Sequence, residues 1–176
     1  MECMSQEKLF IDTRAKRKKP RKLTKIKVEE SPVTVTRKGN AYKHTRTGYR
    51  DDLDLVLRSG WEANFCRVLR SYDIEFEFEP QAFHFPIKRG NKGYVPDFWL
   101  PTTEEWVEVK GYLDNNSKIK IKRFKKYFPE DFAKLTIITG SAKASLEFFK
   151  SIEVPRVLLY SEFRREYKST VKNWEG

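Results

Sequence analysis

The sequence has few of the residues that build disulfide frameworks or zinc sites. Its 176 residues include two cysteines, Cys3 and Cys66, and two histidines, His44 and His84. Two cysteines are too few for a disulfide framework or a zinc cage, and the two histidines do not make a zinc site. We therefore expect a reducing, intracellular environment in which Cys66 packs as a small hydrophobic residue.

Long apolar runs are also missing. No stretch has the form of a secretory signal, and none is long enough to span a membrane. We therefore expect no membrane partner and a cytoplasmic location. The length fits one domain, and a hydrophobic fraction of 39% with 14% aromatic residues can supply a sizeable core.

Positive charge is concentrated at the N-terminus. Residues 1–50 hold 15 Lys/Arg against 5 Asp/Glu, whereas residues 51–176 hold 21 against 20. This predicts a basic, flexible arm at 1–50 and a folded domain at 51–176. A solubilising tail or a targeting signal has the same composition. We favour nucleic-acid contact by counterion release, through Arg14, Lys16, Arg17, Lys18, Lys19, Arg21 and Lys22.

Two short motifs carry the chemistry of the chain. Pro96-Asp97 is followed, after ten residues, by Glu108-Val109-Lys110, and each lies in a strand-like segment. Side chains alternate along a strand, so Glu108 and Lys110 share one face while Val107 and Val109 face the core. A neighbouring strand would bring Asp97 beside Glu108.

Two carboxylates and an amine are the minimal set for metal-assisted phosphodiester cleavage. Mg²⁺ (or Mn²⁺) binds one or two carboxylates together with substrate phosphate. A bound ion can activate a water and neutralise charge on the leaving oxygen. We expect Asp97, Glu108 and the carbonyl of Val109 to hold the metal, and Lys110 to align the water. The alternative is an amphipathic hairpin with Glu108 and Lys110 on a solvated face.

A third acid, Glu62, lies on a predicted helix over residues 59–72. The helix has Ser59 as a plausible N-cap and one buried face. Glu62 falls at the edge of that face, so it either reaches water or faces a cation such as a metal or Lys110. The apolar positions are Leu57, Trp61, Phe65, Val68, Leu69 and Tyr72.

The remaining pattern predicts a mixed sheet flanked by helices. A β-meander is expected at 75–79, 82–88, 93–100 and 105–110, where the first two segments are either separate strands or one strand bent at Pro80. A helix from Ser117 to about Phe128 follows, then strands at 134–139 and 156–160 with a helix at 142–150 between them. The helix from Ser117 is rich in cations. It offers Lys118, Lys122 and Arg123 to DNA, unless these form a solvated face.

With these residues in place, the chain resembles the PD-(D/E)xK nuclease superfamily. Within it, the stretch from Arg58 to about Thr139 resembles the bacteriophage endonuclease I family of Holliday junction resolvases. The matching segments are Arg58-Ser59-Gly60 with Glu62, Glu75-Phe76-Glu77-Phe78-Glu79, Tyr94-Val95-Pro96-Asp97-Phe98, Leu100-Pro101 and Val107-Glu108-Val109-Lys110-Gly111. Trp61-Glu62-Ala63-Asn64 is also similar to phage homing-type endonucleases.

The resemblance implies an α/β fold with a restriction-endonuclease-like αβββαβ core. It also implies that Glu62, Asp97 and Glu108 bind one or two divalent metals, that Lys110 helps to activate the water, and that the enzyme is a homodimer. The basic arm and the segment past Gly140 have no counterpart in it. The expected function is a phage-type, metal-dependent DNA endonuclease selective for branched DNA, located in the host cytoplasm if a phage encodes it. A sequence-specific homing or restriction-type enzyme is the first alternative, and a non-catalytic basic nucleic-acid-binding protein on the same scaffold is the second.

Overall fold

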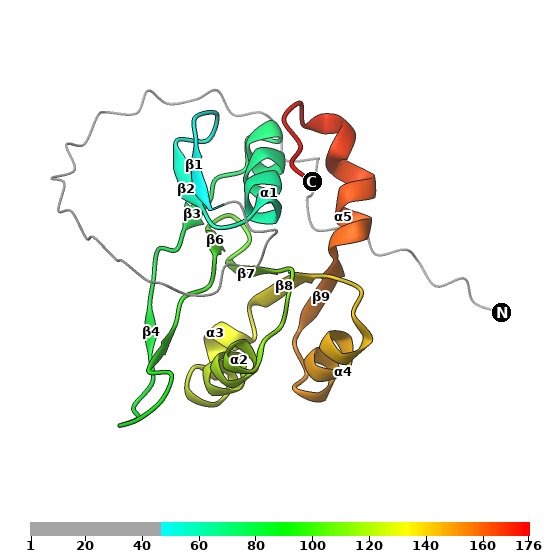
Figure 1. Cartoon of the computed structure of the whole chain (residues 1–176). Coiled ribbons are helices and arrows are strands. Elements are labelled where there is room, and N and C mark those ends of the chain that lie inside the picture. The colour runs from blue at the N-terminus through cyan, green and yellow to red at the C-terminus, as the bar shows by residue number, and fades with distance from the viewer. Residues whose placement is uncertain (1–46) are drawn as a thin grey trace, which may run out of the picture. The chain divides into compact units, whose positions relative to one another are not determined.

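A computed structural model of the chain describes residues 47–176. The expected arm contacts, from Arg14 to Lys22, therefore lie outside the described residues. Helices α1 (Gly60–Ser71) and α5 (Tyr160–Tyr167) lie on one side of a β-sheet, whereas α2 (Asn115–Tyr127), α3 (Pro129–Phe132) and α4 (Lys143–Ser151) lie on the other (Figure 1). Within the described part of the chain, no helix is both long and apolar enough to cross a membrane.

The main sheet has five strands and mixed direction. Their order is β3 (Glu77–Phe78), β6 (Phe98–Leu100), β7 (Glu105–Lys110), β8 (Leu135–Thr139) and β9 (Arg156–Leu159). The pairs β3/β6 and β6/β7 are antiparallel, whereas β7/β8 and β8/β9 are parallel. Parallel neighbours need a crossover connection, which α2 with α3 and then α4 supply. The expected mixed sheet flanked by helices is confirmed.

Strand β7 lies at the centre of the sheet and is covered on both faces. Val107 pairs with Phe98 of β6, and Phe65 of α1 packs on Phe98 with ring centroids 5.0 Å apart. Trp106 points to the opposite face, where its ring meets Phe83 at 5.2 Å. This alternation, expected from the sequence, places the polar residues at the end of β7 on the face of Trp106.

The expected meander is wrong in its middle part. Strands β4 (Phe83–His84) and β5 (Gly93–Tyr94) pair only with each other and form a separate hairpin. The single strand expected at 93–100 is divided between β5 and β6. Pro80, Pro86 and Pro96 lie in these segments, and proline cannot donate the hydrogen bond that a sheet ladder needs.

The expected helix boundaries are close to the observed ones. Ser59 caps α1, because its hydroxyl accepts a hydrogen bond from the Glu62 N–H at 3.2 Å. Helix α2 starts two residues before Ser117, because the Asp114 carboxylate accepts from the Ser117 N–H at 2.6 Å and caps the helix from there. Elements β8, α4 and β9 agree with the sequence to within one residue at each end.

Three elements were not expected. Strands β1 (Gly48–Arg50) and β2 (Leu55–Leu57) form an antiparallel hairpin that includes three residues assigned to the arm. Helix α5 follows β9 directly and continues into a short 3₁₀ helix, η1 (Lys168–Thr170). Residues 171–176, which we call the C-terminal strap, pass over α1. There Glu175 exchanges two backbone hydrogen bonds with the Asn64 amide, at 2.7 and 2.8 Å.

Candidate active site

Asp97 and Glu108 lie next to each other on adjacent strands. Phe98 is paired with Val107 in the antiparallel ladder, so the residue before Phe98 faces the residue after Val107. Asp97 is 8% exposed and Glu108 is 4% exposed. The Val109 N–H donates to Asp97 Oδ2 at 2.8 Å, which fixes the carboxylate against β7. The expected placement of Asp97 beside Glu108 is confirmed.

Both oxygens of Glu108 have a partner. The buried hydroxyl of Tyr94 donates to Oε2 at 2.9 Å. The Lys110 ammonium lies 3.3 Å from Oε1, as expected for two residues on one face of a strand. Glu108 is therefore held in one orientation by a neutral donor on one side and a cation on the other.

These groups line a small pocket of about 80 Å³. Its walls come from the connection before α1, from the segment between β5 and β6, from β7 and from α2. Its α2 wall was not expected, although Ser117, Lys120 and Ile121 share one helix face by their spacing. The lining residues are Arg58, Tyr94, Val95, Asp97, Glu108, Lys110, Ser117, Lys120 and Ile121.

The electrostatics of the pocket are dominated by buried negative charge. Burial raises the pKa of Asp97 well above its usual value, and the carboxylates of Glu108 and Glu62 raise it further. Burial pulls the pKa of the Lys110 ammonium down, but the nearby carboxylates of Glu108 and Asp97 outweigh this effect and its pKa is raised. Lys110 therefore remains protonated, and one cation faces two buried acids.

Glu62 is bound to its own helix terminus. It is 6% exposed, and its carboxylate accepts from the Arg58 N–H at 2.9 Å and from the Ser59 hydroxyl at 2.8 Å. Together with the bond from the Glu62 N–H to Ser59, this is a variant of the capping box, in which the carboxylate accepts from the N–H of the residue before the N-cap; we call it the capping box below. Ser59 and Glu62 have the Ser-x-x-Glu spacing of that motif, which is a local signal for this role of Glu62. Glu62 is not among the residues that line the pocket.

A strained residue supports the pocket from β3. Glu79 has a φ of 47°, in the left-handed region that is uncommon for a residue other than glycine. Its N–H donates to the Asp97 carbonyl at 2.8 Å, and its carboxylate forms an ion pair with Arg58 at the pocket wall. Strain of this kind costs about 1–3 kcal/mol and gathers at functional sites.

The three predicted DNA contacts on α2 lie outside the pocket. Lys118 and Lys122 place their ammonium groups 5.7 and 5.5 Å from the ring centre of Phe148 in α4. The Arg123 guanidinium donates to the Asn91 carbonyl at 2.7 Å, in the loop between β4 and β5. Of the α2 cations, it is Lys120 that lines the pocket.

The donor set suits a hard divalent cation with few protein ligands. Among residues 47–176, no group of three or more His, Cys, Asp or Glu side chains is placed to hold a metal. Mg²⁺ does not require such a group, because it binds one or two carboxylates and completes its shell with water and phosphate. Asp97 and Glu108 offer this pair, and a cation between them would remove the repulsion that raises the pKa of Asp97.

Comparison of the chain with protein-family models, with curated proteins and with solved structures finds no match.

Proposed function

We propose that the protein is a metal-dependent DNA endonuclease of the PD-(D/E)xK type. The observation that carries the proposal is the buried pair Asp97 and Glu108, with Lys110 at 3.3 Å from Glu108, in one small pocket. Burying two carboxylates side by side costs folding free energy. Such a pair is typical of functional sites, where the charges are needed for chemistry. A solvated hairpin face, the alternative reading of Glu108 and Lys110, does not fit a glutamate that is 4% exposed.

The arrangement of elements supports a restriction-endonuclease-like core. Starting at α1, the elements of the main sheet follow in the order α1, β3, β6, β7, α2 and β8, with the β4–β5 hairpin inserted after β3. Fold alone does not determine function. Here Asp97 directly precedes β6 and Glu108 lies on β7, where that core would carry the two acids.

The acids of the site, Lys110 and the Val109 carbonyl each have a role in the proposal. Asp97, Glu108 and the carbonyl of Val109 would hold Mg²⁺ or Mn²⁺, which would supply charge neutralisation at the phosphate and activation of a water. Lys110, kept protonated by both acids, would orient that water and stabilise negative charge on the phosphate oxygens. Glu62 would act on Asp97 through the electrostatic repulsion between the two carboxylates. Direct metal binding by Glu62 would compete with its two cap hydrogen bonds.

Branched DNA is the substrate that we propose. The residues of the family resemblance lie in or beside α1, β3, β5, β6 and β7. They include six that line the pocket: Arg58, Tyr94, Val95, Asp97, Glu108 and Lys110. Cleavage of both strands of a junction would need two active sites, so we propose a homodimer. A sequence-specific homing or restriction-type enzyme would use the same pocket on linear DNA.

The test is cleavage of a labelled four-way junction and a matched linear duplex with Mg²⁺, Mn²⁺ or EDTA. We expect metal-dependent cutting of the junction by the wild type. The Asp97→Asn variant should lose cutting and keep binding. Cutting of the duplex alone would favour a homing or restriction-type enzyme. Binding without cutting under every condition, or full cutting by Asp97→Asn, would overturn the proposal, and the first result would favour a non-catalytic binding protein.

A further inference from the structure

We infer that the β4–β5 hairpin is a phosphate-binding arm for the nucleic-acid backbone beside the pocket, an inference that rests on the proposed function for the identity of its ligand. The hairpin consists of β4, β5 and the loop 85–92 between them. It does not belong to the main sheet, and Figure 1 shows it extending past α2.

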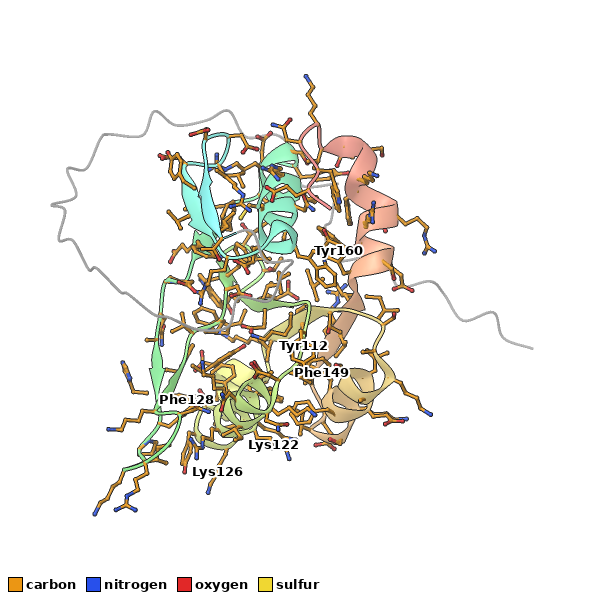
Figure 2. The ribbon with its side chains drawn as sticks, viewed as in Figure 1. Tyr112, Lys122, Lys126, Phe128, Phe149 and Tyr160 are labelled. Carbon is orange, nitrogen blue, oxygen red and sulfur yellow. The ribbon has the colours of Figure 1, made fainter. Side chains whose placement is uncertain are left out.

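The hairpin is fixed to α2 by aromatic rings. Phe83 of β4 packs against Phe124 and Phe128 with ring centroids 4.8 and 5.0 Å apart. Phe85 packs against Tyr127 and Phe128, at 5.8 and 6.3 Å. Figure 2 shows Phe128 between the hairpin and α2. Contacts of this kind hold the hairpin in place without using its polar groups.

The loop of the hairpin is also tied to α2. The Arg123 guanidinium donates to the Asn91 carbonyl at 2.7 Å, and the Asn91 amide lies 3.5 Å from Asn116. Gly90 has a φ of +85° next to the Arg123 side chain, a conformation that favours glycine. The loop is therefore ordered by bonds to its backbone, which leaves its charged side chains available.

Those side chains are exposed cations. Lys88, Arg89 and Lys92 are exposed, and within residues 47–176 none of them forms an ion pair. The segment 80–96 contains no acid. By contrast, Lys125 of α2 is bonded to Glu153 at 2.7 Å, and Lys126 lies 5.2 Å from the ring centre of Tyr127.

The position of the cations relative to the pocket indicates the ligand. Tyr94 and Val95, which directly follow β5 residue Gly93, line the pocket. Lys92 is two residues from Tyr94, a distance of about 7 Å along an extended strand. This distance equals the rise of about two base steps along the axis of a duplex. Phosphates that flank the cut can thus reach the loop while one occupies the pocket. Lysine and arginine contacts to phosphates carry no base information, so the arm would bind without sequence preference.

The test measures DNA affinity against salt concentration in the full-length Asp97→Asn variant, which allows binding to be followed with Mg²⁺ present. The hairpin variant adds Lys88→Gln, Arg89→Gln and Lys92→Gln. The control variant adds Arg164→Gln, Arg165→Gln and Lys168→Gln on α5 and η1, which removes the same charge on the other side of the sheet. The probe is a labelled linear duplex of mixed sequence.

We expect the hairpin variant to reduce the slope of log affinity against log salt by about 2–3, since each lost phosphate contact contributes about 0.9. The control should change the slope by much less. Equal slopes for the hairpin variant and its parent, or equal reductions in both variants, would overturn the inference. If the triple variant does not fold, the single variants Lys88→Gln, Arg89→Gln and Lys92→Gln should each reduce the slope by about 0.9, and unchanged slopes in all three would count against the arm.

The outcome is separable from that of the proposed function. If the wild type cuts no DNA, but the hairpin variant has a reduced slope of log affinity against log salt, the nuclease proposal is refuted and the arm is supported. A wild type that cuts DNA, with a hairpin variant of unchanged slope, would support the nuclease and refute the arm.

Discussion

The carboxyl of Asp97 lies where burial and two neighbouring carboxylates all disfavour its charge. A group whose pKa is raised in the folded state stabilises the fold below its unfolded pKa and loses that contribution as pH rises through the folded value. At neutral pH without metal, the charge of Asp97 therefore costs stability. The sequence motifs predicted that Glu108 lies beside Asp97. They could not predict how deeply Asp97 is buried, because its burial depends on the α2 wall of the pocket.

Replacing Asp97 with Asn should raise the melting temperature of the metal-free protein at neutral pH. The amide is neutral and its oxygen can keep the bond from the Val109 N–H. A gain of about 1 kcal/mol corresponds to roughly 2–8 °C. The measurement is thermal unfolding from pH 5 to 8 with EDTA. The advantage should shrink as the pH falls and wild-type Asp97 is protonated.

Exposed Asp51 is the control for this change, and Asp51→Asn should leave the melting temperature nearly unchanged. A lower melting temperature for Asp97→Asn at neutral pH would show that the carboxylate is not under strain.

Tyr94 is expected to position Glu108 for metal binding. Tyr94→Phe removes the 2.9 Å hydrogen bond to Glu108 Oε2 and keeps the ring. Loss of a residue that orients a metal ligand typically costs 10–100-fold in affinity or activity. We expect the half-saturating Mg²⁺ concentration for cleavage to rise by about tenfold or more.

Tyr127→Phe on α2 is the matched control, because Tyr127 does not line the pocket. An unchanged Mg²⁺ requirement in Tyr94→Phe would remove Tyr94 from the site. A metal-free readout is available as well: the loss of a hydrogen bond to a buried charged group should lower stability by about 1–3 kcal/mol.

At the scale of elements, local patterns were predicted and long-range pairings were not. Alternation in β7, the cap of α1 and the crossover helices follow from neighbours within a few residues. The strands of the β4–β5 hairpin were expected as part of a meander. Its separation from the main sheet was not expected, because its partner is α2, about 30 residues further along the chain, and the bond from Arg123 to Asn91 has no local signal. Helix α5 was missed for a similar reason. Its buried side chains, Tyr160, Phe163 and Tyr167, pack against distant aromatic residues such as Trp61 and Phe65.

We expect the capping box to contribute to the stability of α1. Ser59→Ala removes the acceptor for the Glu62 N–H and one donor to the Glu62 carboxylate. Loss of a serine cap typically costs about 0.5–2 kcal/mol. We expect a destabilisation in this range by chemical denaturation, together with reduced cleavage, because Glu62 would be freed to move.

Ser161→Ala on the exposed side of α5 is the control, and it should change neither quantity. If Ser59→Ala retained full stability, the capping box would not form in solution.

At the scale of the whole molecule, the first described strand and the C-terminal strap meet at α1. The Glu175 carboxylate forms ion pairs with Arg50 of β1 and Arg67 of α1, each at 2.9 Å. Arg67 also pairs with Asp52 at 2.6 Å. Because the two ion pairs of Glu175 join residues more than a hundred positions apart, no window of sequence could predict them.

Glu175→Gln should destabilise the fold by about 1–3 kcal/mol, since two largely buried guanidinium groups lose a carboxylate. The hydrogen bond from Arg50 lowers the pKa of Glu175, and that from Arg67 adds to it, against the opposing effect of burial. A lowered pKa gives stability that is present above the unfolded value and is lost as pH falls through the folded one. Acid unfolding below about pH 4.5 should therefore weaken the wild type more than the variant.

Glu166→Gln on the exposed side of α5 is a suitable control of equal charge. If Glu175→Gln and Glu166→Gln unfolded at the same denaturant concentration at neutral pH, the strap would contribute nothing to stability.

The strap also affects how the chain folds as it is made. Asn64 leaves the ribosome 111 residues before the Glu175 backbone that binds its amide. At about 5–20 residues per second, that interval is about 5–20 s. During this time α1 can form locally, but Asn64 and Arg67 lack their bonds to Glu175. We expect α1 and the β1–β2 hairpin to become resistant to proteolysis only in stalled nascent chains that expose residue 175.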